Sequence, residues 1–255
     1  TAQKLAQMVN DKGGVAYFVG GTVRDMLMGI EPKDIDIEVH RLAQDELEAI
    51  LSTFGEVNLV GKAFGVYKVG ELDIALPRTE TKTGDGHRGF TMEVNPFLGV
   101  IKAMQRRDFT INAIYQNVLT GEISDFFGGI LDIENKILCV VDEGTFVEDS
   151  LRVLRAGQFA SRLGFKVAGR SLDLMRSMDL SDLPAERVMG EIEKLLLGDF
   201  VKHGLQVLDS VGAIEKLFPE LDILRTIPQD AFWHPEGDVW THTLMVMDRA
   251  NEYCN

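Results

Sequence analysis

The length, composition and charge of the chain exclude several classes of protein. It has 255 residues, of which 45% are hydrophobic and 26% are charged, and its formal net charge is −14. These values are typical of a globular protein with two or more domains, and the acidic balance argues against a general nucleic-acid binder, which needs Lys and Arg for phosphate contacts. We find no apolar run long enough to cross a membrane and no signal-peptide pattern, and Cys139 and Cys254 have no metal-ligand spacing. We therefore expect a cytoplasmic protein that needs neither a membrane nor an obligate protein partner.

A glycine turn between a strand and a helix is the first predicted feature with chemical content. Residues 16–19 predict a short apolar strand, which Gly20 and Gly21 end, and residues 22–28 predict a helix. Two glycines let the backbone approach a ligand closely, and the start of a helix offers unpaired N–H groups. The turn therefore predicts a phosphate-binding site, in which Arg24 is expected to bond phosphate in fork geometry.

Asp34 and Asp36 follow in a predicted strand with the sequence DIDIEV. Because side chains alternate along a strand, both carboxylates point to one face, where they repel each other unless a cation lies between them. Hard oxygen ligands beside a phosphate-binding turn suit Mg²⁺, and two such ions can hold the attacking and leaving oxygens of a nucleotidyl transfer. An Asp-x-Asp pair also occurs without function on the solvent face of edge strands. The neighbouring glycine turn and Arg24 favour the metal site here.

The remaining patterns divide the chain into a mixed part and a helical part. Helices are predicted at residues 1–10, 43–51, 97–104 and 108–115. Strands at 57–60, 65–69 and 72–76 join the two strands above in a sheet of about five, and a further strand is predicted at 137–141. The polar, glycine-containing residues 80–94 predict a mobile loop. From about residue 147 only helical patterns occur, at 148–163, 171–178, 184–197 and 201–211. The expected fold class is α+β, with a mixed-sheet head followed by an all-helical body.

The helical part contains a basic stretch in an otherwise acidic protein. Residues 151–176 carry six basic side chains and a single acidic one, Asp173. Such a stretch suits RNA, and it also occurs as a solvated helix face. Composition leaves both interpretations open.

Three motifs resemble those of the class II CCA-adding enzyme and poly(A) polymerase family. Residues 20–25 (GGTVRD) with Asp34-Ile35-Asp36 are similar to the first motif, residues 105–113 (QRRDFTINA) to the second, and residues 148–156 (EDSLRVLRA) to the nucleotide-recognition helix. They occur in the family order and cover the stretch from residue 17 to about 163. The resemblance implies a head with the DNA polymerase beta superfamily nucleotidyltransferase fold. It also implies transfer of CMP and AMP from CTP and ATP to the 3′ end of tRNA without a template.

The resemblance implies specific domain boundaries and metal ligands. Residues 1–140 are expected to form the catalytic head, 141–228 a neck and body for nucleotide recognition and RNA binding, and 229–255 the beginning of an HD-type domain. Asp34 and Asp36 are expected to hold Mg²⁺. Asp73 stands where the family has a third catalytic carboxylate, although it also fits an outward-facing strand residue.

The nucleotide contacts follow from the same resemblance. Gly20, Gly21 and Arg24 are expected to bind phosphate, and Arg107 to reach the nucleotide from the second motif. Arg106 is expected to orient a neighbour or to make an ion pair.

Base selection is expected from the helix that contains Asp149 and Arg152. Residues three apart share a helix face, so the aspartate can accept from the exocyclic amine of C or A while the arginine donates to the ring. An ordinary surface ion pair has the same spacing. Arg155 is a further candidate contact, and Gln158 stands where many members have an arginine, which puts one nucleotide contact in doubt.

Several alternatives remain open. The same motifs occur in poly(A) polymerases and in enzymes that add only CC or only A. Residues 234–244 (HPEGDVWTHTL) resemble the start of an HD-type phosphohydrolase, with His242 as its first metal ligand, but the His-Asp pair that would complete that site is absent from this chain. A phosphohydrolase that keeps the head for nucleotide or RNA binding is therefore a second class of function. A nucleotidyltransferase for a small molecule or a protein is a third class, and the second motif and the helical body argue against it.

Overall fold

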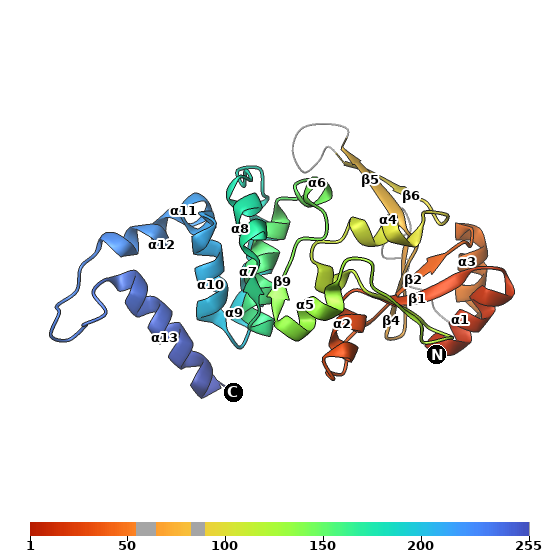
Figure 1. The fold of residues 1–255 in the computed structure, drawn as a ribbon, viewed down its shortest axis with the longest axis horizontal. Coiled ribbons are helices and arrows are strands. Elements are labelled where there is room, and N and C mark those ends of the chain that lie inside the picture. The colour runs from red at the N-terminus through yellow and green to blue at the C-terminus, as the bar shows by residue number, and fades with distance from the viewer. Residues whose placement is uncertain (55–64, 83–89, 255) are drawn as a thin grey trace. The chain divides into compact units, whose positions relative to one another are not determined.

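The computed structural model of the protein describes residues 1–54, 65–82 and 90–254, which fold as two units (Figure 1). Unit 1 contains Thr1–Asn135 and Val140–Thr145, and unit 2 contains Lys136–Cys139 and Phe146–Asn255. None of the described helices is long and apolar enough to span a membrane.

Unit 1 is built on a six-stranded mixed sheet in the order β3-β4-β2-β1-β7-β8. The strands are β1 (Val15–Val19), β2 (Ile35–His40), β3 (Val66–Val69), β4 (Leu72–Ala75), β7 (Tyr115–Asn117) and β8 (Ile123–Ser124). Strands β2 and β4 run parallel, and the other neighbouring pairs run antiparallel. The expected α+β fold with a mixed head sheet is confirmed. The strand predicted at residues 57–60 lies outside the described residues.

Two stretches of unit 1 differ from the sequence predictions. Strands β5 (Arg78–Lys82) and β6 (Phe90–Val94) pair antiparallel where residues 80–94 predicted a loop. Residues 108–115 form a 3₁₀ turn, η3 (Thr110–Asn112), and then enter β7, so the predicted helix is wrong. The Asp108 carboxylate accepts hydrogen bonds from the Phe109 backbone N–H and from Asn112 Nδ2, and such local acceptors compete with helix formation.

The two faces of the sheet carry different chemistry because side chains alternate along each strand. On one face, Ile37 and Val39 of β2 enter an apolar core with residues of α1 (Ala2–Asp11) and α3 (Gln44–Leu51). On the other face, a smaller apolar cluster joins Tyr115 of β7 to α4 (Val100–Gln105). Asp36 and Glu38 alternate with Ile37 and Val39, so their side chains belong to this second face. The remaining helices of unit 1 are α2 (Gly21–Leu27), η1 (Ser52–Phe54) and α5 (Gly129–Asn135).

Unit 2 is almost entirely helical, as predicted. Its helices are α7 (Leu151–Leu163), α8 (Gly169–Arg176), α9 (Ala185–Leu196), α10 (Val201–Ser210), α11 (Ala213–Leu217), α12 (Pro219–Asp222), η4 (Ile223–Thr226) and α13 (Val239–Cys254). Helix α6 (Glu143–Phe146) precedes them at the boundary of the units, and β9 (Ile137–Leu138) and β10 (Lys166–Val167) form a short parallel pair.

Helices α7 and α10 of unit 2 cross closely at two glycines. A Cβ atom on Gly157 would lie 2.6 Å from the Leu208 side chain, and one on Gly204 would lie 2.6 Å from the Gly157 carbonyl oxygen. Such short separations leave no space for a side chain at either position.

Candidate active site

Three carboxylates meet at the N-terminal ends of the parallel strands β2 and β4, and this end of the strands is called the carboxylate edge here. Asp36 of β2 pairs in register with Asp73 of the parallel strand β4, and Asp34 lies just before β2 with 68% of its side chain exposed. The Lys68 ammonium of β3 lies 3.3 Å from the Asp73 carboxylate and 4.0 Å from that of Asp34. The structure therefore brings all three predicted carboxylates together at the carboxylate edge, with a cationic side chain among them.

The electrostatics of this edge fit a divalent cation. Burial raises the pKa of Asp36 above its ordinary value, and the charges of Asp73 and Asp34 raise it further, while Arg107 partly offsets them. The ionised carboxylates therefore repel one another, and a cation between them would relieve that repulsion. The donor set of carboxylate oxygens is the one that Mg²⁺ and similar hard ions prefer.

The glycine turn lies directly against this edge. Gly20 has φ +64°, a backbone conformation that residues with a Cβ atom rarely adopt. A Cβ atom here would lie 2.9 Å from Arg107 Nη1 and 3.7 Å from Asp36 Oδ2. Helix α2 begins at Gly21, and the Thr22 hydroxyl accepts from the Asp36 backbone N–H at 2.8 Å and donates to the Asp34 carbonyl at 3.2 Å. One threonine therefore fixes the start of α2 against the segment that carries the two aspartates.

Arg24, for which phosphate binding stays a prediction, makes its contacts inside unit 1. It is 2% exposed, and its guanidinium donates to the Asp25 carboxylate at 2.6 and 2.8 Å and to Asn112 Oδ1 at 2.7 Å. Charge-assisted hydrogen bonds of this kind hold a buried arginine firmly. Arg24 thus joins α2 to the second motif inside unit 1.

The second-motif arginines lie on the same face of the sheet as Asp36. Arg107 donates from Nε to the Tyr115 hydroxyl at 3.3 Å and from Nη2 to Glu38 at 3.5 Å. Arg106 makes an ion pair with Glu38 at 3.9 Å, in line with its expected role. Glu38 was not singled out from the sequence, although it continues the alternation of Asp34 and Asp36 by one step.

Asp149 and Arg152 lie together at the start of α7 in unit 2. The Asp149 carboxylate accepts from the Leu151 backbone N–H at 3.1 Å and from Arg187 of α9 at 3.0 Å. Arg152 lies over the Phe146 ring, with 5.9 Å between the guanidinium carbon and the ring centre. Arg187 was missed by the sequence analysis, because a partner 38 residues away leaves no local spacing to detect.

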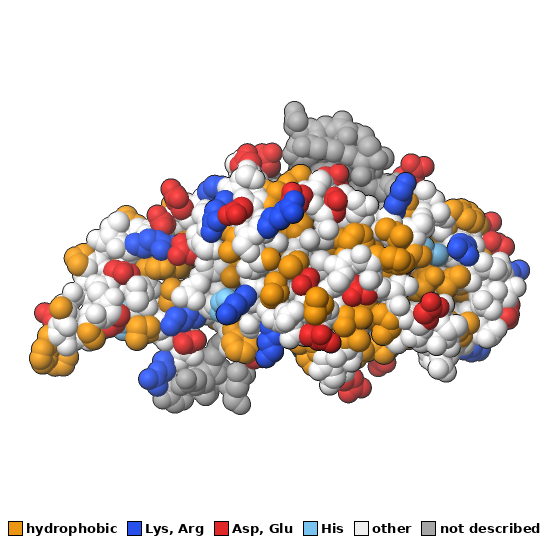
Figure 2. Space-filling model, in the orientation of Figure 1, with side chains coloured by type: hydrophobic (Ala, Val, Ile, Leu, Met, Phe, Trp, Pro, Cys, Tyr) orange, Lys and Arg blue, Asp and Glu red, His pale blue; other side chains and the backbone are white. Residues whose placement is uncertain are grey.

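Arg155 and Gln158 lie further along α7. Arg155 lies over the Phe159 ring at 5.1 Å, and Gln158 is 5% exposed. The predicted nucleotide contact of Gln158 therefore concerns a side chain that packs inside unit 2. Of the basic stretch, Arg162, Lys166, Arg170 and Arg176 are exposed. Figure 2 shows basic side chains at several places over the helices of unit 2, with acidic ones between them.

His242 lies in a small cluster in the last part of unit 2. Its Nδ1 atom lies 2.5 Å from Glu236, whose carboxylate also lies 3.2 Å from His234 Nδ1. Backbone hydrogen bonding and the hydrogen bond with His242 lower the pKa of Glu236 to about 2. One ligand atom from each of the three residues lies within 4.8 Å of the others, which is a spacing that could hold a metal ion.

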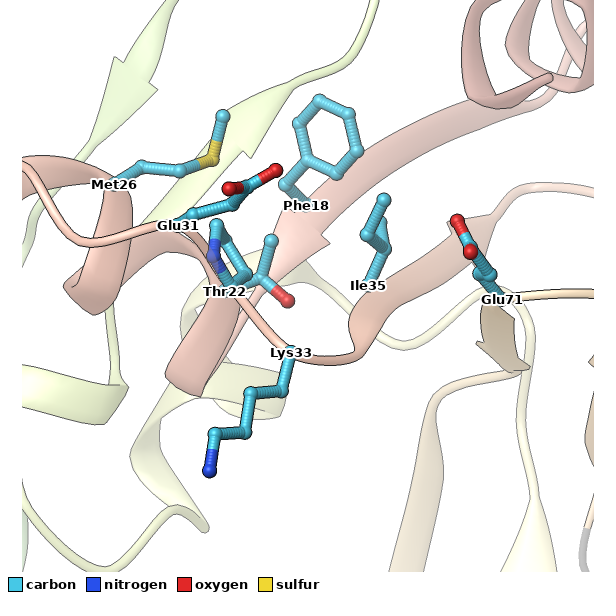
Figure 3. A pocket seen from close by; sticks show the side chains of 8 residues that line it. Phe18, Thr22, Met26, Glu31, Lys33, Ile35 and Glu71 are labelled. Carbon is cyan, nitrogen blue, oxygen red and sulfur yellow. The ribbon is translucent and has the colours of Figure 1, made fainter.

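A pocket of about 340 Å³ opens beside α2 and the start of β2 (Figure 3). Its lining includes Thr22, Phe18 and Ile35. Phe18 and Ile35 pack against the apolar core that also contains residues of α1 and α3. None of the predicted site residues lines it. The pocket therefore borders the apolar side of β2 rather than the carboxylate edge.

Comparisons with known proteins identify the family of the chain. Residues 16–139 match the model of the poly A polymerase head domain, and residues 164–224 match that of the probable RNA and SrmB-binding site of polymerase A. The chain is 41% identical over 243 residues to the multifunctional CCA protein of Pasteurella multocida, covering 92% of this chain and 56% of that protein. The chain belongs to the class II CCA-adding enzyme and poly(A) polymerase family.

Solved structures of CCA-adding enzymes extend the similarity to the fold. The Bacillus stearothermophilus CCA-adding enzyme in complex with CTP is 33% identical, with a TM-score of 0.71 over 83% of this chain and 52% of that one. The Thermotoga maritima CCA-adding enzyme complexed with tRNA is 27% identical, with a TM-score of 0.70 over 86% of this chain and 52% of that one. The chain spans between 52% and 56% of the length of these three relatives.

Proposed function

We propose that the protein is a template-independent tRNA nucleotidyltransferase, which adds CMP and AMP from CTP and ATP to the 3′ end of tRNA. The observation that carries the proposal is the register pairing of Asp36 with Asp73, beside Asp34 and the glycine turn. Relatives and structural neighbours named for CCA addition, one in complex with CTP and one with tRNA, support the same activity.

Asp34 and Asp36, with Asp73 beside them, would hold Mg²⁺ at the sheet edge. When bound, the ion supplies charge neutralisation for the triphosphate and lowers the pKa of the attacking 3′-hydroxyl. The turn at Gly20 and Gly21 brings backbone close to the phosphates, and Arg107 offers its guanidinium next to Asp36. Thr22 keeps the backbone of the two aspartates in place during the reaction.

Base selection is assigned to the start of α7. The Asp149 carboxylate would accept from the exocyclic amine that C and A share, and Arg152 would donate to the ring. The contact from Arg187 orients Asp149 for this task. Arg155 is a further candidate for the nucleotide, and Gln158 supports the helix from inside.

Sequencing of tRNA 3′ ends tests the proposal. Purified protein is incubated with Mg²⁺ and tRNA that lacks its terminal CCA, together with CTP, ATP or both. The expected product ends in CCA when both nucleotides are present. Addition of CC only, of A only, or of a long A tract would identify the narrower relatives, and an unextended tRNA would refute nucleotidyl transfer.

The cluster of His234, Glu236 and His242 supports one second candidate, a metal-dependent phosphohydrolase. Replacing both Asp34 and Asp36 by Ala separates the two functions. The double variant loses nucleotide addition, whereas a hydrolase at the other site keeps its activity on a phosphomonoester.

A further inference from the structure

Glu38 continues the line of polar side chains on the face of β2 that carries Asp36. Its side chain carries a carboxyl group, yet the residue is only 1% exposed. Burial acts to raise the pKa of Glu38, but the hydrogen bond with His40 and the charge of Arg107 outweigh burial and lower the pKa to about 2. A buried, ionised carboxylate requires partners on all sides.

One oxygen of Glu38 is fixed by two neighbours on the sheet. Oε1 accepts from the Tyr115 hydroxyl at 2.7 Å and lies 2.8 Å from His40 Nε2. His40 is held in turn, because its Nδ1 lies 3.2 Å from the Leu98 carbonyl and the Tyr17 ring packs edge-on against the imidazole at 5.4 Å. The carboxylate therefore has a single defined orientation.

The other oxygen of Glu38 faces the second motif. Oε2 lies 3.5 Å from Arg107 Nη2 and 3.9 Å from Arg106 Nη2. Tyr115 reinforces the contact with Arg107, since its hydroxyl accepts from Nε at 3.3 Å and its ring lies 5.1 Å from the guanidinium carbon. Tyr115 and Glu38 thus bind two of the three nitrogens of the Arg107 guanidinium, Nε and Nη2.

The third nitrogen of the Arg107 guanidinium points to the glycine turn. Among the described residues no hydrogen bond is made by Nη1, and this atom lies 2.9 Å from the position of a Cβ on Gly20. The same Cβ position is 3.7 Å from Asp36 Oδ2. Nη1 is therefore presented at the predicted phosphate turn, beside a metal-binding carboxylate.

We propose that Glu38 and Tyr115 are positioning residues that fix Arg107 beside Asp36 and present its Nη1 to the nucleotide triphosphate. This inference rests on the proposed function, in which Arg107 contacts the nucleotide. An arginine that is ordered before the nucleotide arrives loses less side-chain freedom on binding, so nucleotide affinity rises without a new contact. Strand β2 then carries both Asp36 and Glu38, the residue that holds Arg107. The distance between Asp36 and Arg107 is therefore kept constant.

A matched pair of tyrosine variants tests the inference. Tyr67 of β3 is also fully buried, and its hydroxyl donates to Glu48 at 3.0 Å, but it lies in the apolar core on the opposite face of the sheet. Y115F and Y67F therefore remove the same atom from the same sheet, and only Y115F touches Arg107. The dissociation constant for CTP is measured by calorimetry without tRNA, and KM and kcat for CTP are measured with tRNA lacking its CCA end.

We expect Y115F to weaken CTP binding and to raise KM about fivefold, the usual effect of one lost hydrogen bond, with kcat within about twofold of wild type. Y67F should leave all three values within about twofold, although both variants lose some thermal stability. E38Q provides a second test, with a larger loss of CTP affinity, and melting curves establish that each variant folds.

The outcomes separate the inference from the proposed function. Equal CTP affinities in Y115F and Y67F, or a fall in kcat with KM unchanged, would overturn the positioning role even if wild-type protein adds CCA. If wild-type protein binds CTP but never extends tRNA, the proposed function is wrong, and the binding comparison still decides the positioning role. Wild-type protein that does not bind CTP overturns both.

Discussion

The two faces of the unit 1 sheet use the same strands for opposite purposes. On one face of β2, Ile37 and Val39 are buried among the apolar side chains of α1 and α3. On the other face, Asp36 and Glu38 are packed with arginines, a histidine and a tyrosine. Apolar packing stabilises without direction, whereas the polar face fixes the orientation of charged groups at a cost in stability. Variants on neighbouring residues of β2 should therefore separate stability from activity.

Asp36→Asn should have the largest effect on activity and little on stability. Under the proposed function Asp36 is a metal ligand, and its loss removes several kcal/mol of transition-state stabilisation, so nucleotide addition is expected to fall roughly a thousandfold or more. In metal-free buffer the variant should melt no lower than wild type, because the neutral amide removes the repulsion from Asp34 and Asp73. Rates and melting curves check the two parts. A large drop in melting temperature would show that the carboxylate is structural.

Glu38→Gln should lower both nucleotide affinity and stability. CTP binding is expected to weaken more than about tenfold. The free energy of unfolding should fall by about 2 kcal/mol, because the partly buried Arg106 and Arg107 lose their counter-charge. The pKa of Glu38 is lowered from an ordinary 4.5 to about 2, so its stabilisation is present above pH 4.5 and is lost as the pH falls towards 2. The difference in unfolding free energy between wild type and variant should therefore shrink over that range. A pH-independent difference would contradict the ionised state of Glu38.

Arg187→Gln should have a smaller effect that is confined to base selection. Its ion pair with Asp149 is partly exposed and is worth at most about 1 kcal/mol, so discrimination of CTP against UTP should fall roughly threefold with little change in rate. Arg176→Gln is the matched control, because it breaks an exposed ion pair with Asp173 elsewhere in unit 2. Equal discrimination in both variants would show that Arg187 does not orient Asp149.

Ile37→Val should leave activity unchanged. The side chain is in the apolar core, and loss of one methylene there costs about 1 kcal/mol of unfolding free energy. CTP affinity, KM and kcat should stay within about twofold of wild type. A change in CTP affinity would mean that the two faces of β2 are coupled through the strand. It would contradict the separation of stability on one face from activity on the other.

The sequence predicted the parts of the site that depend on local periodicity. The alternation in DIDIEV placed Asp34 and Asp36 on one face, and the glycine turn and the helix after it occur where expected. The contacts of Arg24 inside unit 1 could not be predicted in this way, since its partner Asn112 is 88 residues away. The same holds for Lys68, whose proximity to Asp34 depends on the order of β3, β4 and β2.

Two further features depend on side-chain contacts that the sequence pattern does not show. Residues 108–115 have helical spacing, but hydrogen bonds to the Asp108 carboxylate hold a 3₁₀ turn instead. The nucleotide contact of Gln158 stays a prediction, and its burial depends on how α7 packs in unit 2. Neither effect leaves a signature in spacing or composition.

The close crossing of α7 and α10 makes α7, to which base selection is proposed to belong, sensitive to added side-chain volume. Alanine normally raises helix propensity over glycine by about 1 kcal/mol. At Gly157 or Gly204 the added methyl group would act as a wedge between the two helix axes, because atoms of the opposite helix already lie within 2.6 Å of its position. The placement of Asp149 and Arg152 thus depends on two residues that contribute no side chain at all.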